Sequence, residues 1–233
     1  MIIRHNSGMW THTGKEARQD ADVLCEVMFL DGYATKTFPT TGRPEVVLDI
    51  GAHIGSFASM WKRRNPASRI VCVEANPDNW ECLVANVEGY ATVVRAACTY
   101  EKEFQFCNSI CENGTATGGG YIAPRGNPVS DVYRLEERTI VGMTIEDILE
   151  MTGLAGQVIH LLKLDCEGSE YSILANSTVL PRTRFIVGEY HGTTKKWDQE
   201  RRRLLGPEWK YTLLRSDFHQ GSFIYENTQC PAS

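Results

Sequence analysis

Short apolar strands alternate with amphipathic helices in the first half of the chain, and this alternation constrains the fold more than any other feature. The run 46–50 is apolar and β-branched, which is typical of a strand buried on both faces of a parallel sheet. A helical pattern follows over 56–64, and further strands are expected over 69–74 and 91–96, with a helix between them that ends at Gly89. This order predicts a doubly wound parallel α/β sheet.

The rest of the chain adds elements of the same two kinds. We expect helices over 15–30, 144–153 and 195–205, strands over 158–165 and 185–189, and an antiparallel pair of strands, 210–215 and 222–226, at the sheet edge. A length of 233 residues fits one domain. We therefore expect a single domain over 1–233, with a helical substrate-side segment over 1–44 and a ligand-binding core over 45–233.

The segment 108–131 departs from this pattern because it is rich in Gly, Asn, Pro and Ser. A structureless stretch of this length is unusual inside a domain and is most often a functional loop or disordered. We interpret it as a mobile loop on the substrate side.

Composition and charge exclude several partners. A net charge of −5 gives no general attraction to nucleic acid or to an anionic membrane. The sequence has no apolar stretch long enough for a membrane span and no signal-peptide core at its start. The basic run 201–203 is interpreted as a solvated helix face. Eight cysteines without a C-x-x-C pair indicate reduced structural thiols in a cytoplasmic protein.

The densest motif is the turn 49–55, which follows a buried strand and precedes a helix. Glycines at this place let the backbone approach a ligand closely, and the helix N-terminus offers free N–H groups. In doubly wound sheets, ligands bind at the carboxyl ends of the strands. The candidate cofactor-binding residues of the turn are Asp49, Gly51, Ala52, His53, Gly55 and Ser56.

The ends of the next two strands complete the candidate cofactor site. Glu74 can accept hydrogen bonds from both ribose hydroxyls of a nucleoside, with Ala75 and Asn76 beside it and Ala96 at the end of the third strand. The glycine spacing is G-x-x-x-G, whereas a dinucleotide turn has G-x-G-x-x-G. The Asp49 carboxylate would repel a pyrophosphate but attract the ammonium of a methionine moiety. These features favour S-adenosylmethionine over NAD.

A second group of polar residues lies at the ends of the fourth and fifth strands. The motif 162–170 places Lys163 two residues before Asp165 on the same strand face, where its ammonium can pair with a carboxylate. Glu189 and His191 end the next strand. Carboxyl ends of parallel strands meet at one edge of a sheet, so we expect these groups beside the glycine turn.

At this point the sequence resembles the FkbM-type methyltransferase family. The resemblance rests on the turn 49–55, on Glu74-Ala75-Asn76-Pro77 and on the motif 162–170, and it spans about 46–191. It implies a class I methyltransferase fold, with a seven-stranded, mostly parallel sheet and an antiparallel C-terminal strand. It also implies methyl transfer, usually to oxygen, from S-adenosylmethionine with S-adenosylhomocysteine as product. Hydroxyls or carboxyls of small molecules, sugars and natural products are the acceptors that it implies.

Methyl transfer to a hydroxyl benefits from a general base, and His191 is the first candidate because histidine titrates near neutrality. We expect Glu189 to orient His191 or bind substrate, and Asp165 to contact the methionine end of the cofactor or the acceptor. His191 could equally be a structural histidine at a strand end. A divalent metal held by Asp165, Glu167, Glu189 and His191 is possible, but the spacing does not demand it and no metal is predicted.

Two other functions fit the same fold. The chain could be a non-catalytic nucleoside-binding or partner-binding protein, or an NAD-dependent oxidoreductase. We expect a small-molecule methyl acceptor as partner, with no nucleic acid and no membrane.

Overall fold

The computed structural model describes all residues except 1, 5, 14–15, 112–113, 116–117, 130, 132, 137 and 231–233. Its centre is a seven-stranded sheet in the order β14-β15-β13-β12-β3-β4-β5. These strands are β3 (Val46–Ile50), β4 (Arg69–Val73), β5 (Ala91–Val94), β12 (Ile159–Leu164), β13 (Thr183–His191), β14 (Trp209–Ser216) and β15 (Gln220–Asn227). Only β15 runs against the others, and it pairs antiparallel with both β13 and β14. The expected fold class is confirmed, with the antiparallel strand lying one place in from the edge.

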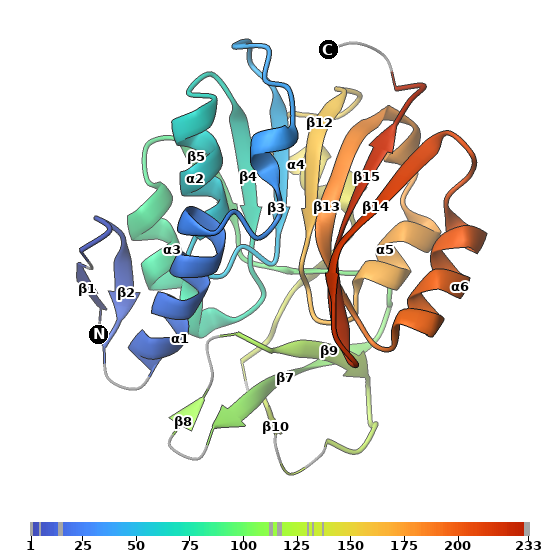
Figure 1. Ribbon diagram of the computed structural model, residues 1–233. Helices are drawn as coiled ribbons and strands as arrows, with labels where there is room; N and C mark the ends of the chain where they lie inside the picture. The colour runs from blue at the N-terminus through green and yellow to red at the C-terminus, as the bar shows by residue number, and fades with distance from the viewer. Residues whose placement is uncertain are drawn as a thin grey trace.

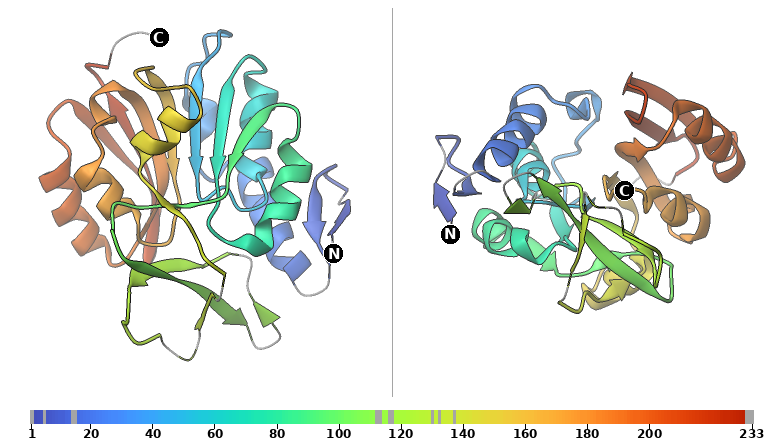
Figure 2. Two further views of the ribbon diagram at one scale, coloured as in Figure 1. Left: turned by 180° about the vertical axis from the view of Figure 1, so that it is seen from behind. Right: turned by 90° about the horizontal axis from the view of Figure 1, so that it is seen from below.

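Helices cover both faces of this sheet (Figures 1 and 2). They are α1 (Glu16–Leu24), the π-helix η1 (Cys25–Phe29), α2 (Ser56–Arg64), α3 (Trp80–Val87), α4 (Ile145–Met151), α5 (Glu170–Asn176) and α6 (Thr194–Leu204). Because side chains alternate along a strand, Leu48 packs in one core cluster with residues of α4, α5 and α6. Val47 packs in the other cluster with residues of η1, α2 and α3. Burial on both faces explains why β3 is apolar nearly throughout.

The register of the central strands brings polar residues to one edge. Lys163 on β12 lies opposite Asp49 on β3, and it lies opposite Val187 on β13 on the other side. Because β3, β4, β12 and β13 are parallel, their carboxyl ends meet at the same edge. The glycine turn, Glu74 and the motif 162–170 therefore converge there.

The segment 108–131, expected as an irregular loop, belongs to a small antiparallel sheet in the part that the structure describes. Its strands are β7 (Phe104–Cys111), β8 (Gly114–Thr115), β9 (Tyr121–Pro124) and β10 (Tyr133–Leu135), and β7 pairs with all three others. This sheet lies across the carboxyl edge of the large sheet (Figures 1 and 2). The expectation of an irregular loop was wrong for these strands. Phe106 and Cys107 are buried, and their burial stabilises β7 although the sequence that follows it is rich in glycine.

The N-terminal segment packs beside α3. A hairpin of β1 (Ile2–Arg4) and β2 (Trp10–His12) precedes α1. Its second strand, β2, contacts both α1 and α3. The helix expected over 15–30 is present as α1 followed by η1, with Leu24 and Val27 buried. Two smaller strands, β6 (Ala97–Cys98) and β11 (Gly142–Met143), pair with each other elsewhere. Three short 3-10 helices complete the fold: η2 (Thr35–Thr37), η3 (Pro77–Asn79) and η4 (Leu180–Arg182).

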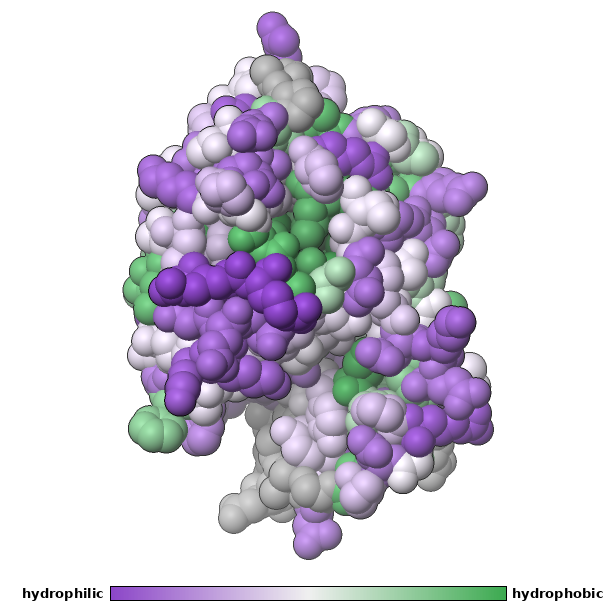
Figure 3. Space-filling model, turned by 90° about the vertical axis from the view of Figure 1, so that its right-hand side faces the viewer, coloured by the Kyte–Doolittle hydropathy of each residue, from purple (hydrophilic) through white to green (hydrophobic). Residues whose placement is uncertain are grey.

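The outer face beside α6 and β14 is largely hydrophilic (Figure 3). On α6, Arg203 pairs with Glu200, and Arg201 pairs with Asp198. Arg203, 66% exposed, fits the interpretation of a solvated face, whereas Arg201 is 16% exposed and lies over the ring of Tyr211.

Within the described part of the chain, no helix combines the length and the apolar character needed to cross a membrane.

Candidate active site

A cavity of about 290 Å³ opens at the carboxyl edge of the large sheet. The predicted site residues that line it are Gly51, Ala52, His53, Ser56, Glu74, Ala75, Asn76, Ala96, Asp165, Glu189 and His191. Phe106 of β7, Ile122 of β9 and the segment 118–120 before β9 also line it. Asp49 and Gly55 are the two predicted residues that the structure places outside the lining.

The glycine turn is fixed by close backbone packing. Gly51 has φ +76°, and a Cβ atom there would lie 1.8 Å from the carbonyl oxygen of Asp165, so only glycine fits. The amides of Gly51 and Ala52 both donate to the carbonyl of Val73 at the end of β4. Gly55, with φ +86°, lets α2 approach α3, because a Cβ there would lie 2.8 Å from the side chain of Val87. Gly55 therefore positions the helix behind the turn.

Asp49 lies one layer behind the cavity. Its side chain is fully buried, and its carboxylate faces the ammonium of Lys163, whose Nζ is 3.3 Å from Oδ1. Burial raises the pKa of Asp49, and the Lys163 ammonium opposes that rise. The sequence interpretation gave Asp49 a direct contact with the cofactor ammonium. In the structure Lys163 occupies that position beside the carboxylate.

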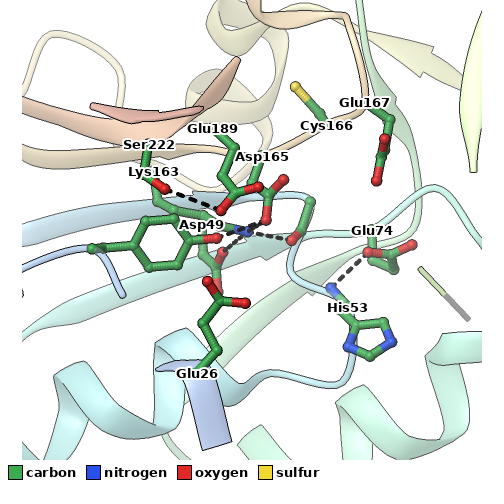
Figure 4. A network of polar contacts seen from close by, with 12 residues as sticks. Glu26, Asp49, His53, Glu74, Lys163, Asp165, Cys166, Glu167, Glu189 and Ser222 are labelled. Carbon is green, nitrogen blue, oxygen red and sulfur yellow. Dashed lines mark hydrogen bonds and ion pairs between the residues drawn. The ribbon is translucent and has the colours of Figure 1, made fainter. Parts of the chain in front are cut away.

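The Lys163 ammonium joins the glycine turn to the end of β12 (Figure 4). Its Nζ donates to the carbonyl of Gly51 at 2.5 Å and lies 3.7 Å from Oδ2 of Asp165. Burial alone would lower the pKa of Lys163, but the charges of Asp49 and Asp165 raise it above its usual value. The expected pairing of Lys163 with a carboxylate is confirmed, and it involves two carboxylates.

Asp165 is held from a second side by Tyr33, a residue that sequence reasoning missed. The Tyr33 hydroxyl donates to Oδ2 of Asp165 at 2.7 Å across 132 positions of sequence. Burial would raise the pKa of Asp165, but Lys163, His191 and this hydrogen bond lower it. Asp165 therefore stays a carboxylate at the cavity wall. The chain segment around Tyr33 carries no motif that could have pointed to it.

His191 lies between two carboxylates. Its Nδ1 is 3.2 Å from Oε1 of Glu170, and its Nε2 is 3.3 Å from Oε2 of Glu167. Burial would lower the pKa of His191, but the hydrogen bond and charge of Glu170 and the charge of Glu167 raise it to about 10. An imidazolium with both nitrogens engaged is a poor proton acceptor near neutrality. This geometry argues against the assignment of His191 as the general base.

Glu170 organises the turn between β12 and α5. It is fully buried, and its two carboxylate oxygens accept the amides of Cys166 and Gly168, each at 2.8 Å. The same carboxylate binds His191. Glu170 thus connects the motif 162–170 to the end of β13.

Glu167 has the properties that a base requires. It lines the cavity, and its side chain is 34% exposed. Burial raises its pKa to about 7, although the charge of His191 opposes the rise. Its backbone has φ +54°, a left-handed conformation that costs free energy for a residue with a Cβ atom. The surrounding fold therefore keeps Glu167 in a backbone conformation that residues with a Cβ atom disfavour.

Glu189 has partners other than His191. Its Oε1 accepts hydrogen bonds from Arg215 at 2.7 Å and Ser222 at 3.2 Å. Arg215 also pairs with Glu26 of η1, which reaches the same region from the opposite side (Figure 4). Burial and the charge of Asp165 raise the pKa of Glu189, while Arg215 lowers it. The orientation of His191 that was expected of Glu189 comes from Glu167 and Glu170.

Glu74 lies at the other end of the cavity with His53 (Figure 4). Its Oε2 accepts the amide of His53 at 2.7 Å, and its Oε1 accepts the amide of Asn76 at 2.7 Å. Burial raises its pKa, and these hydrogen bonds oppose the rise. The carboxylate therefore has a fixed orientation at the end of β4.

One group of possible metal ligands lies at this cavity. Asp165, Glu189 and His191 each offer a ligand atom within 4.8 Å of the others. The Lys163 ammonium lies 3.7 Å from Asp165, and Arg215 binds Glu189, so both carboxylates of this group already face a cation of the chain. These charges oppose a metal ion here. The absence of a metal at this cavity stays a prediction.

The methyltransferase FkbM domain matches residues 49–217, so the chain belongs to the FkbM methyltransferase family. No curated protein matches the sequence significantly.

Solved structures with a similar fold include the methyltransferase domain of METTL16, with a TM-score of 0.51 and 10% identity over 97% of this chain and 86% of that one. The fibrillarin pre-rRNA processing protein of Methanococcus jannaschii has a TM-score of 0.50 and 9% identity over 85% and 74%. At these identities the likeness shows the fold alone.

We predict that Lys163→Met lowers the free energy of unfolding by about 3–5 kcal/mol, because it leaves the Asp49 carboxylate buried without a counter-charge. Adding Asp49→Asn to this variant should recover a large part of the loss. Lys210→Met is the control, since the Lys210 side chain is 71% exposed and should change stability by less than about 1 kcal/mol. Urea denaturation measures all four proteins, and equal losses in the single and double variants would contradict the buried pair.

We predict that the His191 ring stays protonated through neutrality. Its pKa is raised from 6.5 to about 10 in the folded protein. The stabilisation is therefore fully present below pH 6.5 and is lost as the pH rises toward 10. Heteronuclear NMR of the imidazole should show no titration between about pH 6 and 8, while Glu170→Gln should bring the His191 midpoint down. A wild-type midpoint near the ordinary histidine value would refute the arrangement between two carboxylates.

Proposed function

We propose that this chain uses S-adenosylmethionine to methylate a hydroxyl oxygen of a small molecule. The observation that carries the proposal is that one cavity is lined by the glycine turn, by the Glu74 carboxylate held by backbone amides, and by the Glu167 carboxylate of near-neutral pKa. The glycine turn and Glu74 suit a nucleoside with an amino acid, and Glu167 suits an acceptor that must lose a proton.

The lining residues fit the cofactor. Gly51 allows close backbone approach, and in this proposal Glu74 accepts hydrogen bonds from the ribose hydroxyls. Ala75 and Ala96 provide a small apolar wall on the same side. Asp165, kept as a carboxylate, suits the ammonium of the methionine moiety. The cofactor would supply an activated methyl group on a sulfonium, so the chain has to align an acceptor oxygen with it.

The acceptor side of the cavity favours a hydroxyl over a carboxylate. Glu26, Asp165, Glu167 and Glu189 all line the cavity. The cations that also line it, Lys163 and His191, are engaged by carboxylates of the chain. A carboxylate acceptor would therefore meet like charge, whereas a neutral hydroxyl would not. This narrows the expectation drawn from the family resemblance.

We assign Glu167 as the proton acceptor. In this assignment the hydroxyl proton of the acceptor moves to the Glu167 carboxylate as the oxygen gains its methyl group. His191 keeps its own proton and acts as a positioning residue, because it holds the Glu167 side chain at 3.3 Å. A pKa of about 7 leaves a useful fraction of Glu167 ionised at neutral pH.

The acidic lining and the net charge of −5 also favour a small, uncharged acceptor over a nucleic acid.

The test combines two variants with a control. Glu167→Gln should bind S-adenosylhomocysteine within about twofold of wild type but lower turnover on a panel of small alcohols, phenols and sugars at least about 100-fold. Glu74→Ala should weaken S-adenosylhomocysteine binding at least tenfold, about 1.4 kcal/mol. Glu81→Ala removes an exposed carboxylate on α3 and should change neither quantity.

Turnover is followed by formation of S-adenosylhomocysteine, and binding by calorimetry. Unchanged turnover in Glu167→Gln would overturn the assignment of the base. Unchanged affinity in Glu74→Ala would overturn the location of the cofactor.

A further inference from the structure

A second group of metal-ligating side chains lies apart from the acidic end of the cavity. His12 on β2, Asp20 on α1 and Cys82 on α3 each offer one ligand atom, and these atoms lie within 4.8 Å of one another. Asp20 and Cys82 are fully buried, and His12 is 7% exposed. Three elements that are distant in sequence therefore bring an imidazole, a carboxylate and a thiol to one buried point.

We propose that His12, Asp20 and Cys82 form a structural zinc site that joins the N-terminal hairpin and α1 to α3. Zinc accepts nitrogen, oxygen and sulfur ligands, and its bond lengths of about 2.0–2.3 Å place tetrahedral ligand atoms about 3.3–3.8 Å apart. The three side chains need only small movements to reach that spacing, because their ligand atoms already lie within 4.8 Å.

The His12 ring is oriented as a metal ligand requires. Its Nε2 lies 2.8 Å from the carbonyl oxygen of Asp78, so that nitrogen carries a proton and donates it. Its Nδ1 faces Oδ2 of Asp20 at 2.9 Å. A backbone acceptor on one nitrogen leaves the other as the ligand, which is the arrangement that commonly orients metal-binding histidines. The amide of His12 also donates to Asp20 at 2.7 Å, which fixes the carboxylate.

Zinc bound here by one carboxylate, one thiolate and one neutral imidazole would have its two positive charges balanced by the two anionic ligands. The occupied site would therefore bury no net charge.

The ligand types distinguish this cluster from the one formed by Asp165, Glu189 and His191. That group offers two carboxylates and an imidazole, and Lys163 and Arg215 contact its carboxylates. The cluster of His12, Asp20 and Cys82 instead contains a thiol, a soft ligand that favours zinc over magnesium or calcium.

His53 of the glycine turn lies next to this cluster. Its Nε2 is 3.5 Å from Oδ1 of Asp20, and neither of its buried ring nitrogens has a hydrogen-bond partner among the described residues. Buried polar atoms are usually satisfied, and a zinc-bound water beside Asp20 would satisfy the nearer nitrogen.

The site would connect the N-terminal segment to the cofactor end of the cavity. His53 belongs to the glycine turn and lines the cavity, and Asp20 stands beside it. A metal bound to Asp20 would therefore hold α1 in position at the cavity wall, and the metal itself would take no part in methyl transfer.

The experiment uses the full chain without a polyhistidine tag, stripped of metal by a chelator and kept reduced. We expect one equivalent of Co²⁺ to give tetrahedral d–d bands and a thiolate-to-cobalt charge-transfer band, both abolished by stoichiometric Zn²⁺. Cys82→Ser should remove the charge-transfer band, and His12→Asn should weaken Co²⁺ binding at least tenfold. Cys98→Ser is the matched control, because Cys98 is a buried free cysteine outside the cluster.

Wild-type protein alone supplies a second measurement that does not depend on the folding of any variant. The metal-free chain should gain thermal stability when Zn²⁺ is added and lose it again with chelator. Absence of both the cobalt bands and the zinc-dependent stabilisation in wild type would overturn the proposal. A charge-transfer band that survives Cys82→Ser would overturn it as well.

Discussion

The buried ammonium of Lys163 is the group on which the geometry of the site depends. It binds the carbonyl of Gly51 and faces Asp49 and Asp165, so one positive charge joins the ends of β3 and β12. A buried charge is stable only when it is paired, and here the pairing also fixes the turn that the cofactor would contact. The tyrosine hydroxyl of Tyr33 completes this arrangement from the N-terminal segment.

The motif 162–170 can be explained position by position from these contacts. Lys163 and Asp165 form the charge network, Glu167 faces the cavity, and Gly168 adopts φ +105° in the turn. Glu170 closes the turn through two backbone amides and reaches His191. The charge-rich motif 162–170 therefore folds as one unit, in which most charged side chains pair with another group of the chain.

Much of the fold and part of the site could be predicted from the sequence, because the apolar runs and the glycine turn determine which strand ends meet. The positions of Glu74, Asp165 and the glycine turn followed from that rule alone. Tyr33, Glu26 and Arg215 could not be predicted, since their contacts join segments far apart in the chain. The charge on His191 was also beyond local reasoning, because it is set by carboxylates on another element. Glycine-rich composition likewise concealed the small sheet around β7, whose buried Phe106 supports it.

The central claim is that the cavity organised by Lys163 binds a methionine-linked nucleoside. Calorimetric titration of the purified chain with S-adenosylhomocysteine, and separately with NADH, tests it most directly. The account predicts micromolar binding of S-adenosylhomocysteine at one site per chain and no binding of NADH. Binding of NADH without binding of S-adenosylhomocysteine would contradict the account.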